Sequence, residues 1–236
     1  MSRPLRIQYE GAWYHVMNRG RARQAIFEDG HDYTTFLETV GEAVERFRAE
    51  IHAYCLMPNH YHLLVRTLEA NLARVMRHVD GLYTQRYNRR HGTDGPLFRG
   101  RYRAIVIDAD AYLLSVSRSI HRNPIDGRRP LVEGLESWPW SSYRAFVREA
   151  RPPPWLTLDT TLAMVGTRNR YAAYRRFVAV AVEEEVAAYY ANQRATPVLG
   201  DAPFRERVLG GIAVPDEVPG LPTRTPRSAD EVLEAV

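Results

Sequence analysis

Two histidines set two residues apart are the side chains of this chain whose types and spacing could do chemistry. His60 and His62 lie in the run Met57–Val65, which becomes wholly apolar after them. On a β-strand, residues i and i+2 point to the same face, so the two imidazoles would project side by side. Two imidazoles can chelate one metal ion if a third group reaches it. Alone, such a pair more often marks a half-exposed polar strand face, so other features must support a site.

The elements that would position this pair alternate in a recognisable order. Hydrophobic periodicity and β-propensity predict four strands, at Trp13–Met17, Ile51–Leu56, His60–Arg66 and Leu97–Asp108. They predict helices at Asp32–Ala49, Leu72–Arg90 and Asp110–Pro124. The order β-α-β-β-α-β is the ferredoxin-like pattern, an α+β fold with an antiparallel four-stranded sheet and helices on one face. The open face of that sheet is where a site would lie.

The remaining chain suggests a helical C-terminal extension. We expect a ferredoxin-like domain over residues 1–150, a helical extension over 151–210 and a Pro-rich tail over 211–236. Within these, the aromatic segment Trp138–Tyr143 should dock on the first domain, with helices at Asn169–Asn192 and Pro203–Leu209.

The charge is unevenly placed along the chain. All 32 basic residues are arginine; residues 1–130 hold 20 of them against 14 acids, and residues 131–236 hold 12 against 14. An arginine fork suits phosphate, and a basic patch is the electrostatic mark of nucleic-acid binding. All-arginine usage can follow genomic base composition, so only the asymmetry favours a polyanionic partner for the N-terminal half.

Several protein classes are disfavoured. No apolar run reaches the ~18–20 residues of a membrane span, and the N-terminus lacks the apolar core of a signal peptide. A single cysteine, Cys55, excludes an internal disulfide and fits a reducing cytoplasm. We expect Cys55 to be a packed core residue.

Taken together, five runs resemble the REP-associated tyrosine transposases, a branch of the single-tyrosine HUH endonucleases. They occur in the family's order and are spread over residues 12–143: Tyr14–Gly20, Ala53–Leu64, Gly95–Tyr102, Tyr112–Pro124 and Trp138–Tyr143. The resemblance implies a bacterial, cytoplasmic, nucleoid-associated protein that cleaves and rejoins single-stranded DNA at hairpin-forming repeats. Such proteins have the ferredoxin-like fold that was reached independently above.

The resemblance also implies a metal site. His60 and His62 would bind a divalent ion, Mg²⁺ or Mn²⁺, and Asn123 maps onto the amide that completes the site. A hard cation would neutralise charge on the scissile phosphate, and a phenolic oxygen would attack it to form a phosphotyrosine. Asn-Pro is also a common helix-stop signal, so Asn123 has a structural interpretation too.

The chain departs from the family pattern at Ser119, which stands where the nucleophilic tyrosine is expected. A serine hydroxyl ends roughly 4 Å short of a tyrosine oxygen, and no obvious base is adjacent. Three explanations stay open: a natural, catalytically silent DNA-binding member, a deliberate substitution, or another tyrosine acting instead. Tyr112 is on the same helix face, about 10 Å away along the axis, so we expect it to pack rather than react.

Arginines near the histidines are the expected DNA contacts. Those predicted are Arg19, Arg21, Arg23, Arg99, Arg101, Arg103, Arg118 and Arg122. Phe98 or Tyr102 could stack on unpaired bases.

Three functions therefore remain: a metal-dependent nickase and strand transferase blunted by Ser119, a DNA-hairpin-binding module, and, more remotely, an RNA or small-phosphoester hydrolase. The segment from Ser228 resembles the first helix of a helix-turn-helix appendage, which would make this chain a truncation.

Overall fold

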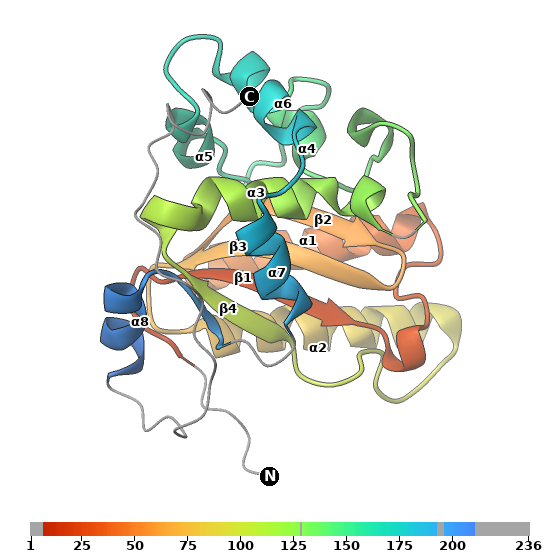
Figure 1. The fold of residues 1–236 in the computed structure, drawn as a ribbon. Coiled ribbons are helices and arrows are strands. Elements are labelled where there is room, and N and C mark those ends of the chain that lie inside the picture. Colours follow the sequence, from red (N-terminus) through yellow and green to blue (C-terminus); the bar gives the residue numbers. More distant parts are fainter. Residues whose placement is uncertain (1–6, 128, 193–195, 211–236) are drawn as a thin grey trace.

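One mixed β-sheet lies at the centre of the molecule (Figure 1). The structure is a computed structural model, and it describes residues 7–127, 129–192 and 196–210. Its strands are β1 (Trp13–Arg19), β2 (Ala49–Met57), β3 (His60–Thr67), β4 (Arg103–Ile107) and β5 (Val198–Leu199). They lie in the order β2-β3-β1-β4-β5; β5 is parallel to β4 and the other pairs are antiparallel. The predicted ferredoxin-like α+β arrangement is confirmed, with a fifth short strand added from the C-terminal extension.

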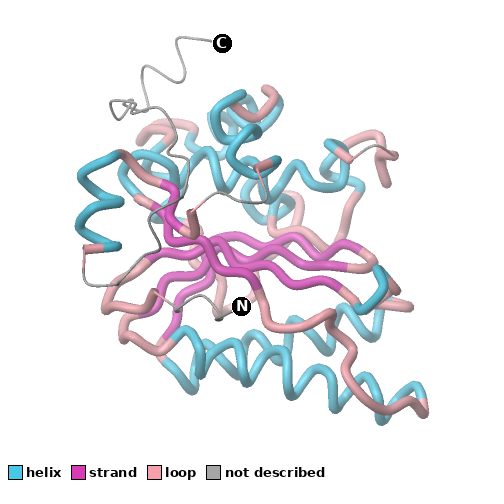
Figure 2. The backbone as a smooth tube through the Cα atoms, turned by 60° about the horizontal axis from the view of Figure 1, so that its bottom comes forward, coloured by secondary structure: helices cyan, strands magenta, loops and turns pink. Residues whose placement is uncertain are grey.

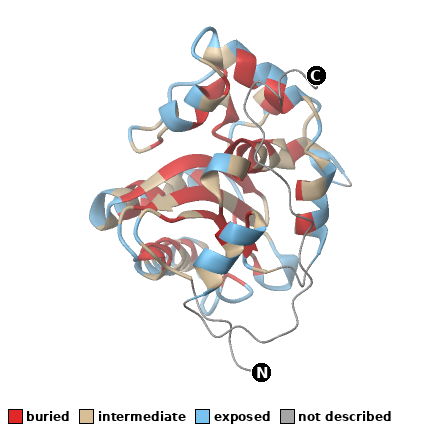
Figure 3. Ribbon diagram, turned by 60° about the vertical axis from the view of Figure 1, so that its left-hand side comes forward, coloured by how far each residue is buried: buried red, intermediate tan, exposed pale blue. Residues whose placement is uncertain are grey.

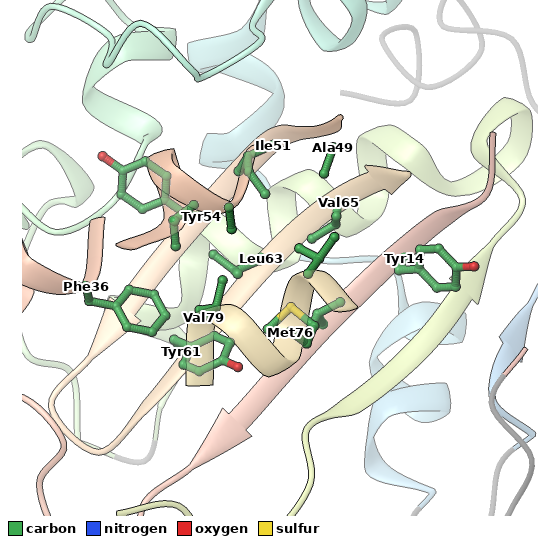
Figure 4. Packing of buried hydrophobic residues seen from close by; sticks show 14 of the residues in the cluster. Tyr14, Phe36, Ala49, Ile51, Tyr54, Tyr61, Leu63, Val65, Met76 and Val79 are labelled. Atoms are coloured by element: carbon green, nitrogen blue, oxygen red, sulfur yellow. The ribbon is translucent and has the colours of Figure 1, made fainter. Parts of the chain in front are cut away.

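One face of the sheet is covered by α1 (Gly30–Phe47) and α2 (Leu72–His91), which form a separate layer in Figure 2. Alternate strand residues such as Tyr61, Leu63 and Val65 pack against these helices, as Figure 4 shows. The period-2 alternation of β3 therefore buries its apolar residues here and sends its histidines to the other face.

The opposite face is partly covered as well. The helix α3 (Ala109–Asp126) and the helix α7 (Glu184–Ala191) lie across it, and Val116 and Val186 join Ile105 of β4 in a second buried cluster. Helices on one face were predicted, and α1 and α2 fulfil this. Figure 1 shows both helices lying over this face of the sheet.

The helix α3 does not end at Pro124, as was predicted, but runs to Asp126. Proline has no N–H to donate to the carbonyl of Ile120, four residues earlier. The side-chain Nδ2 of Asn123 supplies that donor, at 3.2 Å from Ile120 O, and also donates to Ser119 O at 2.8 Å. The helix therefore continues past the proline because its neighbour replaces the missing hydrogen bond.

The extension packs against the outer side of α3. Its helices α5 (Asp159–Met164) and α6 (Arg170–Ala179) contact α3, and α4 (Tyr143–Phe146), just before the extension, contacts α6. The helix α8 (Ala202–Leu209) lies against β5 instead. Short 3₁₀ turns lie at Arg21–Arg23 and Leu135–Ser137. The predicted single helix over 169–192 is wrong, because it breaks into α6 and α7. Arg122 of α3 donates to the carbonyls of Val178 and Ala179, which ends α6. Buried positions in Figure 3 follow the strands and the inward sides of these helices.

The segment Trp138–Tyr143 docks along β2, as predicted. Leu56 N–H donates to Trp140 O, and the Trp138 indole donates to Leu56 O. Tyr54 exchanges backbone and hydroxyl hydrogen bonds with Ser142. Cys55 is fully buried, also as predicted. The domain division at residue 150 stays a prediction, and the tail with its helix from Ser228 lies outside the described residues.

Candidate metal and nucleic-acid site

The two histidines lie side by side on β3, on the sheet face shared with α3 and α7. Their ring centroids are 5.1 Å apart. Arg19 and Met17 of β1 stand opposite them in the strand register. Nδ1 of His60 is 2.8 Å from Asn59 Oδ1, which fixes the ring from the preceding turn.

Asn123 reaches the pair from α3. Its side chain hydrogen-bonds with His60. Because Nδ2 of Asn123 is committed to two helix carbonyls, Oδ1 is the atom that faces the imidazole. Two imidazole nitrogens and one amide oxygen form a donor set that suits a divalent cation and leaves positions open for other ligands. The residues present fit the expected ion.

Burial keeps these imidazoles neutral, the form that binds metals. Desolvation, with Arg19 nearby, lowers the pKa of His60 to about 4. Burial, helped by His15 and His60, places the pKa of His62 well below its usual value. Within the described residues no group of three His, Cys, Asp or Glu side chains is arranged to hold a metal ion, and the Asn123 amide supplies a further oxygen beside the histidine pair.

Two further residues of this site were missed by the sequence interpretation. Nε2 of His15 is 2.8 Å from Nδ1 of His62, and Nδ1 of His15 is 2.6 Å from the hydroxyl of Tyr190. Strand alternation could have indicated His15, because it faces away from the apolar Tyr14 and Val16. No local signal indicated Tyr190, which arrives on α7 from far along the chain.

An arginine-lined groove of about 1110 Å³ opens beside the histidines. Its wall includes five of the predicted arginines: Arg19, Arg23, Arg99, Arg101 and Arg103. Within the described residues none of these five pairs with a carboxylate, whereas Arg48, Arg66, Arg86, Arg90 and Arg175 all do. The positive charge around the groove is therefore not neutralised by neighbouring acids.

A second depression of about 360 Å³ lies on the other side of His60. Arg23, Asn59 and His60 line both hollows, and Asn123 and Leu131 line only the second. Leu131 is 44% exposed, a large apolar side chain at the rim. His60 thus stands between a strongly basic hollow and a more apolar one.

The loop before β4 shapes the groove. The predicted strand from Leu97 is wrong, because β4 begins only at Arg103. Residues 97–99 instead hold the end of β1 through Arg21 N–H to Leu97 O and Arg99 N–H to Arg19 O. Asn18 then donates to Gly100 O and to the buried carboxylate of Asp80. These bonds anchor the loop that carries Arg99 and Arg101.

The other predicted DNA contacts are placed differently. Arg118 is buried over the ring of Phe177 and pairs with Glu183, and Arg122 pairs with Asp126. Both hold the extension rather than line the groove. Arg21 is exposed beside the groove without lining it. Phe98 is buried against Tyr61, so it is not available to stack on a base.

The nucleophile position lies on the same helix as Asn123. Ser119 stands one turn before Asn123 on α3. Tyr112 is buried, and its hydroxyl donates to Glu185 at 2.7 Å. It packs against α7, as predicted, and does not face the histidines.

The fold and this site define the class: a ferredoxin-like domain with a histidine pair beside an arginine-lined groove. Residues 8–123 match the family model described as "Transposase IS200 like". This segment therefore belongs to the IS200-like transposase family. A comparison with curated proteins finds none that matches.

Among solved structures, the chain is similar to a REP-associated tyrosine transposase bound to a REP hairpin. The identity is 18%, the alignment covers 66% of this chain and 92% of that one, and the TM-score is 0.53. A Deinococcus radiodurans protein described as a transposase aligns with 16% identity over 44% of this chain and 85% of its own, with a TM-score of 0.35. Within the described residues, no helix has the length and apolar character needed to cross a bilayer.

Proposed function

We propose that this chain binds single-stranded DNA that folds into hairpins, in the bacterial cytoplasm, with a phosphate held beside His60. The observation that supports this most directly is the set of groove arginines without carboxylate partners. Such arginines would contact backbone phosphates and position the strand. The family match, and the hairpin carried by the solved transposase of similar fold, support the same partner.

His60, His62 and Asn123 would hold a Mg²⁺ or Mn²⁺ ion. When bound, the ion would neutralise charge on a phosphate of the strand. The protein itself keeps both imidazoles neutral by burial and fixes His60 through Asn59. The basic hollow would take the DNA backbone, and the more apolar hollow at Leu131 would take an unpaired base.

Strand cleavage is the part of the family's chemistry that Ser119 removes. A serine hydroxyl on this turn stops well short of the position of a tyrosine oxygen, and Tyr112 is turned away against Glu185. We therefore propose a catalytically silent hairpin-binding protein with a retained metal site. The alternative, a working nickase and strand transferase, needs a different nucleophile.

Binding is tested by fluorescence anisotropy with labelled hairpins from the host genome's repeats. Arg99→Ala with Arg101→Ala should weaken binding and flatten its salt dependence, by nearly one unit of log–log slope for each phosphate that is no longer neutralised. Arg175→Ala, which removes an arginine paired with Glu136 and Glu149, is the control and should change neither. Equal affinity in the double variant would contradict the groove as the binding surface.

Chemistry is tested by covalent attachment in Mn²⁺. The unchanged protein should form no denaturation-resistant adduct, and Ser119→Tyr should form one, because a phenolic oxygen could then attack phosphorus. Adding Tyr112→Phe to Ser119→Tyr should leave the adduct intact. An adduct from the unchanged protein would support the nickase instead.

A further inference from the structure

A chain of three side chains links the extension to the candidate metal site. The hydroxyl of Tyr190 on α7 contacts Nδ1 of His15 on β1, and Nε2 of His15 contacts Nδ1 of His62 on β3. His15 is only 2% exposed, so water does not replace these partners readily. Neither Tyr190 nor His15 is a proposed metal ligand, but both belong to the hydrogen-bonded chain that ends at the ring of His62, which is one.

The two hydrogen bonds restrict where the protons lie. An imidazole binds a metal through a nitrogen without a proton, so His62 must carry its proton on Nδ1 to offer Nε2. That Nδ1–H then donates to Nε2 of His15, whose own proton must lie on Nδ1. His15 Nδ1–H in turn needs an acceptor, and the oxygen of Tyr190 is 2.6 Å away.

We propose that Tyr190 is a positioning residue that, through His15, allows His62 to adopt the tautomer able to bind a divalent ion. This inference rests on the proposed function and deepens it, because the extension would then complete the metal site. The Tyr190 hydroxyl contacts His15 and not His62, so its effect on the metal-binding ring is indirect.

Removing the Tyr190 hydroxyl should reverse the direction in which the hydrogen bond between His15 and His62 is donated. Without it, a proton on His15 Nδ1 would be a buried donor with no acceptor, which is costly. His15 would instead carry its proton on Nε2 and donate to His62 Nδ1. The proton of His62 would then lie on Nε2 and block that nitrogen for a metal.

The test compares the unchanged protein with Tyr190→Phe by ¹⁵N NMR of the histidine rings without metal, and by calorimetric titration with Mn²⁺ alone. We expect His62 to move towards the Nε2–H tautomer in Tyr190→Phe. We also expect Mn²⁺ affinity to fall by about tenfold or more, the usual range for a residue behind a metal ligand. An unchanged tautomer together with an unchanged affinity would overturn the inference.

Tyr189→Phe is the matched control, because Tyr189 is the adjacent tyrosine of α7 and its hydroxyl bonds to Thr196 O instead. It should leave both readouts as they are; if it shifts them equally, the effect is general loosening of α7 and the inference fails. Hairpin binding in EDTA tests the proposed function separately. The His62 tautomer can therefore stay unchanged in the NMR comparison while DNA binding is observed, which contradicts only this inference. Conversely, DNA binding can be absent while the tautomer shifts, which contradicts only the proposed function.

Discussion

At His60 and His62, burial sets the protonation state before any ligand arrives. Both imidazoles are held neutral because burial lowers their pKa, and the charge of Arg19 adds to this effect at His60. The same environment makes them poor proton carriers and good ligands. Asn123 serves two purposes, since one end of its amide completes the helix and the other faces His60.

His60→Ala should abolish measurable Mn²⁺ binding, because a single imidazole and an amide form a weak site. The measurement is calorimetric titration. His31→Ala, which removes an exposed histidine of α1 on the far side of the sheet, should bind Mn²⁺ like the unchanged protein. Retained binding in His60→Ala would place the metal elsewhere.

Asn123→Ala should have two separable effects. It leaves the Ile120 carbonyl without its donor, which should lower the free energy of unfolding by about 1 kcal/mol in urea titrations. It also removes the amide oxygen, so Mn²⁺ affinity should fall. A stability loss with unchanged affinity would show that Asn123 only supports the helix at Pro124 and does not bind the metal.

At the scale of elements, α3 is fixed to the extension and to β2 by a buried polar cluster. His121 contacts the Tyr174 hydroxyl through Nδ1 and Ser142 Oγ through Nε2, and Ser117 contacts the same tyrosine. This cluster fixes the position of α3, and therefore of Asn123, relative to the sheet. Its members come from α3, α6 and the segment that docks on β2.

Tyr174→Phe should cost about 1–3 kcal/mol of unfolding free energy, because it leaves buried polar atoms of His121 and Ser117 short of a partner. Urea unfolding followed by circular dichroism measures this. Tyr171→Phe, on the same helix and half-buried, should change stability by less than about 0.5 kcal/mol. Equal losses would mean that the cluster contributes little.

Some elements could be predicted from the sequence, and others depend on contacts between distant segments. Alternation and periodicity predicted the first three strands and the helices α1 and α2 to within a few residues, because local patterns decide those elements. The break between α6 and α7 carries no glycine or proline, and depends on Arg122 reaching across from α3. For the same reason His60, His62 and five groove arginines could be predicted, whereas Tyr190 and the inward turn of Arg118 could not.

At the scale of the whole molecule, buried histidines determine the response to acid. Burial lowers the pKa of His15 and His121 to about 3 and that of His60 to about 4, against an unfolded value near 6.5. The unfolded chain therefore binds more protons below pH 6.5, so stability present above that pH is lost as the pH falls towards 4. Burial raises the pKa of Asp80 to about 6, which acts in the opposite direction for one group.

The unfolding free energy should consequently be several kcal/mol lower at pH 5 than at pH 7.5, at about 1.4 kcal/mol per histidine per pH unit. Urea titrations at both pH values, at constant ionic strength, measure the difference. Equal or greater stability at pH 5 would mean that these histidines are not desolvated as described.

The docked aromatic segment has a consequence for self-association. The outward backbone groups of β2 are already occupied: Ile51 O accepts from Thr157, Tyr54 exchanges bonds with Ser142, and Leu56 is bonded by Trp140 and Trp138. An exposed edge strand is a template on which another chain can add a strand. Because the docked segment already occupies this edge, two copies of the protein cannot join by extending the sheet at β2.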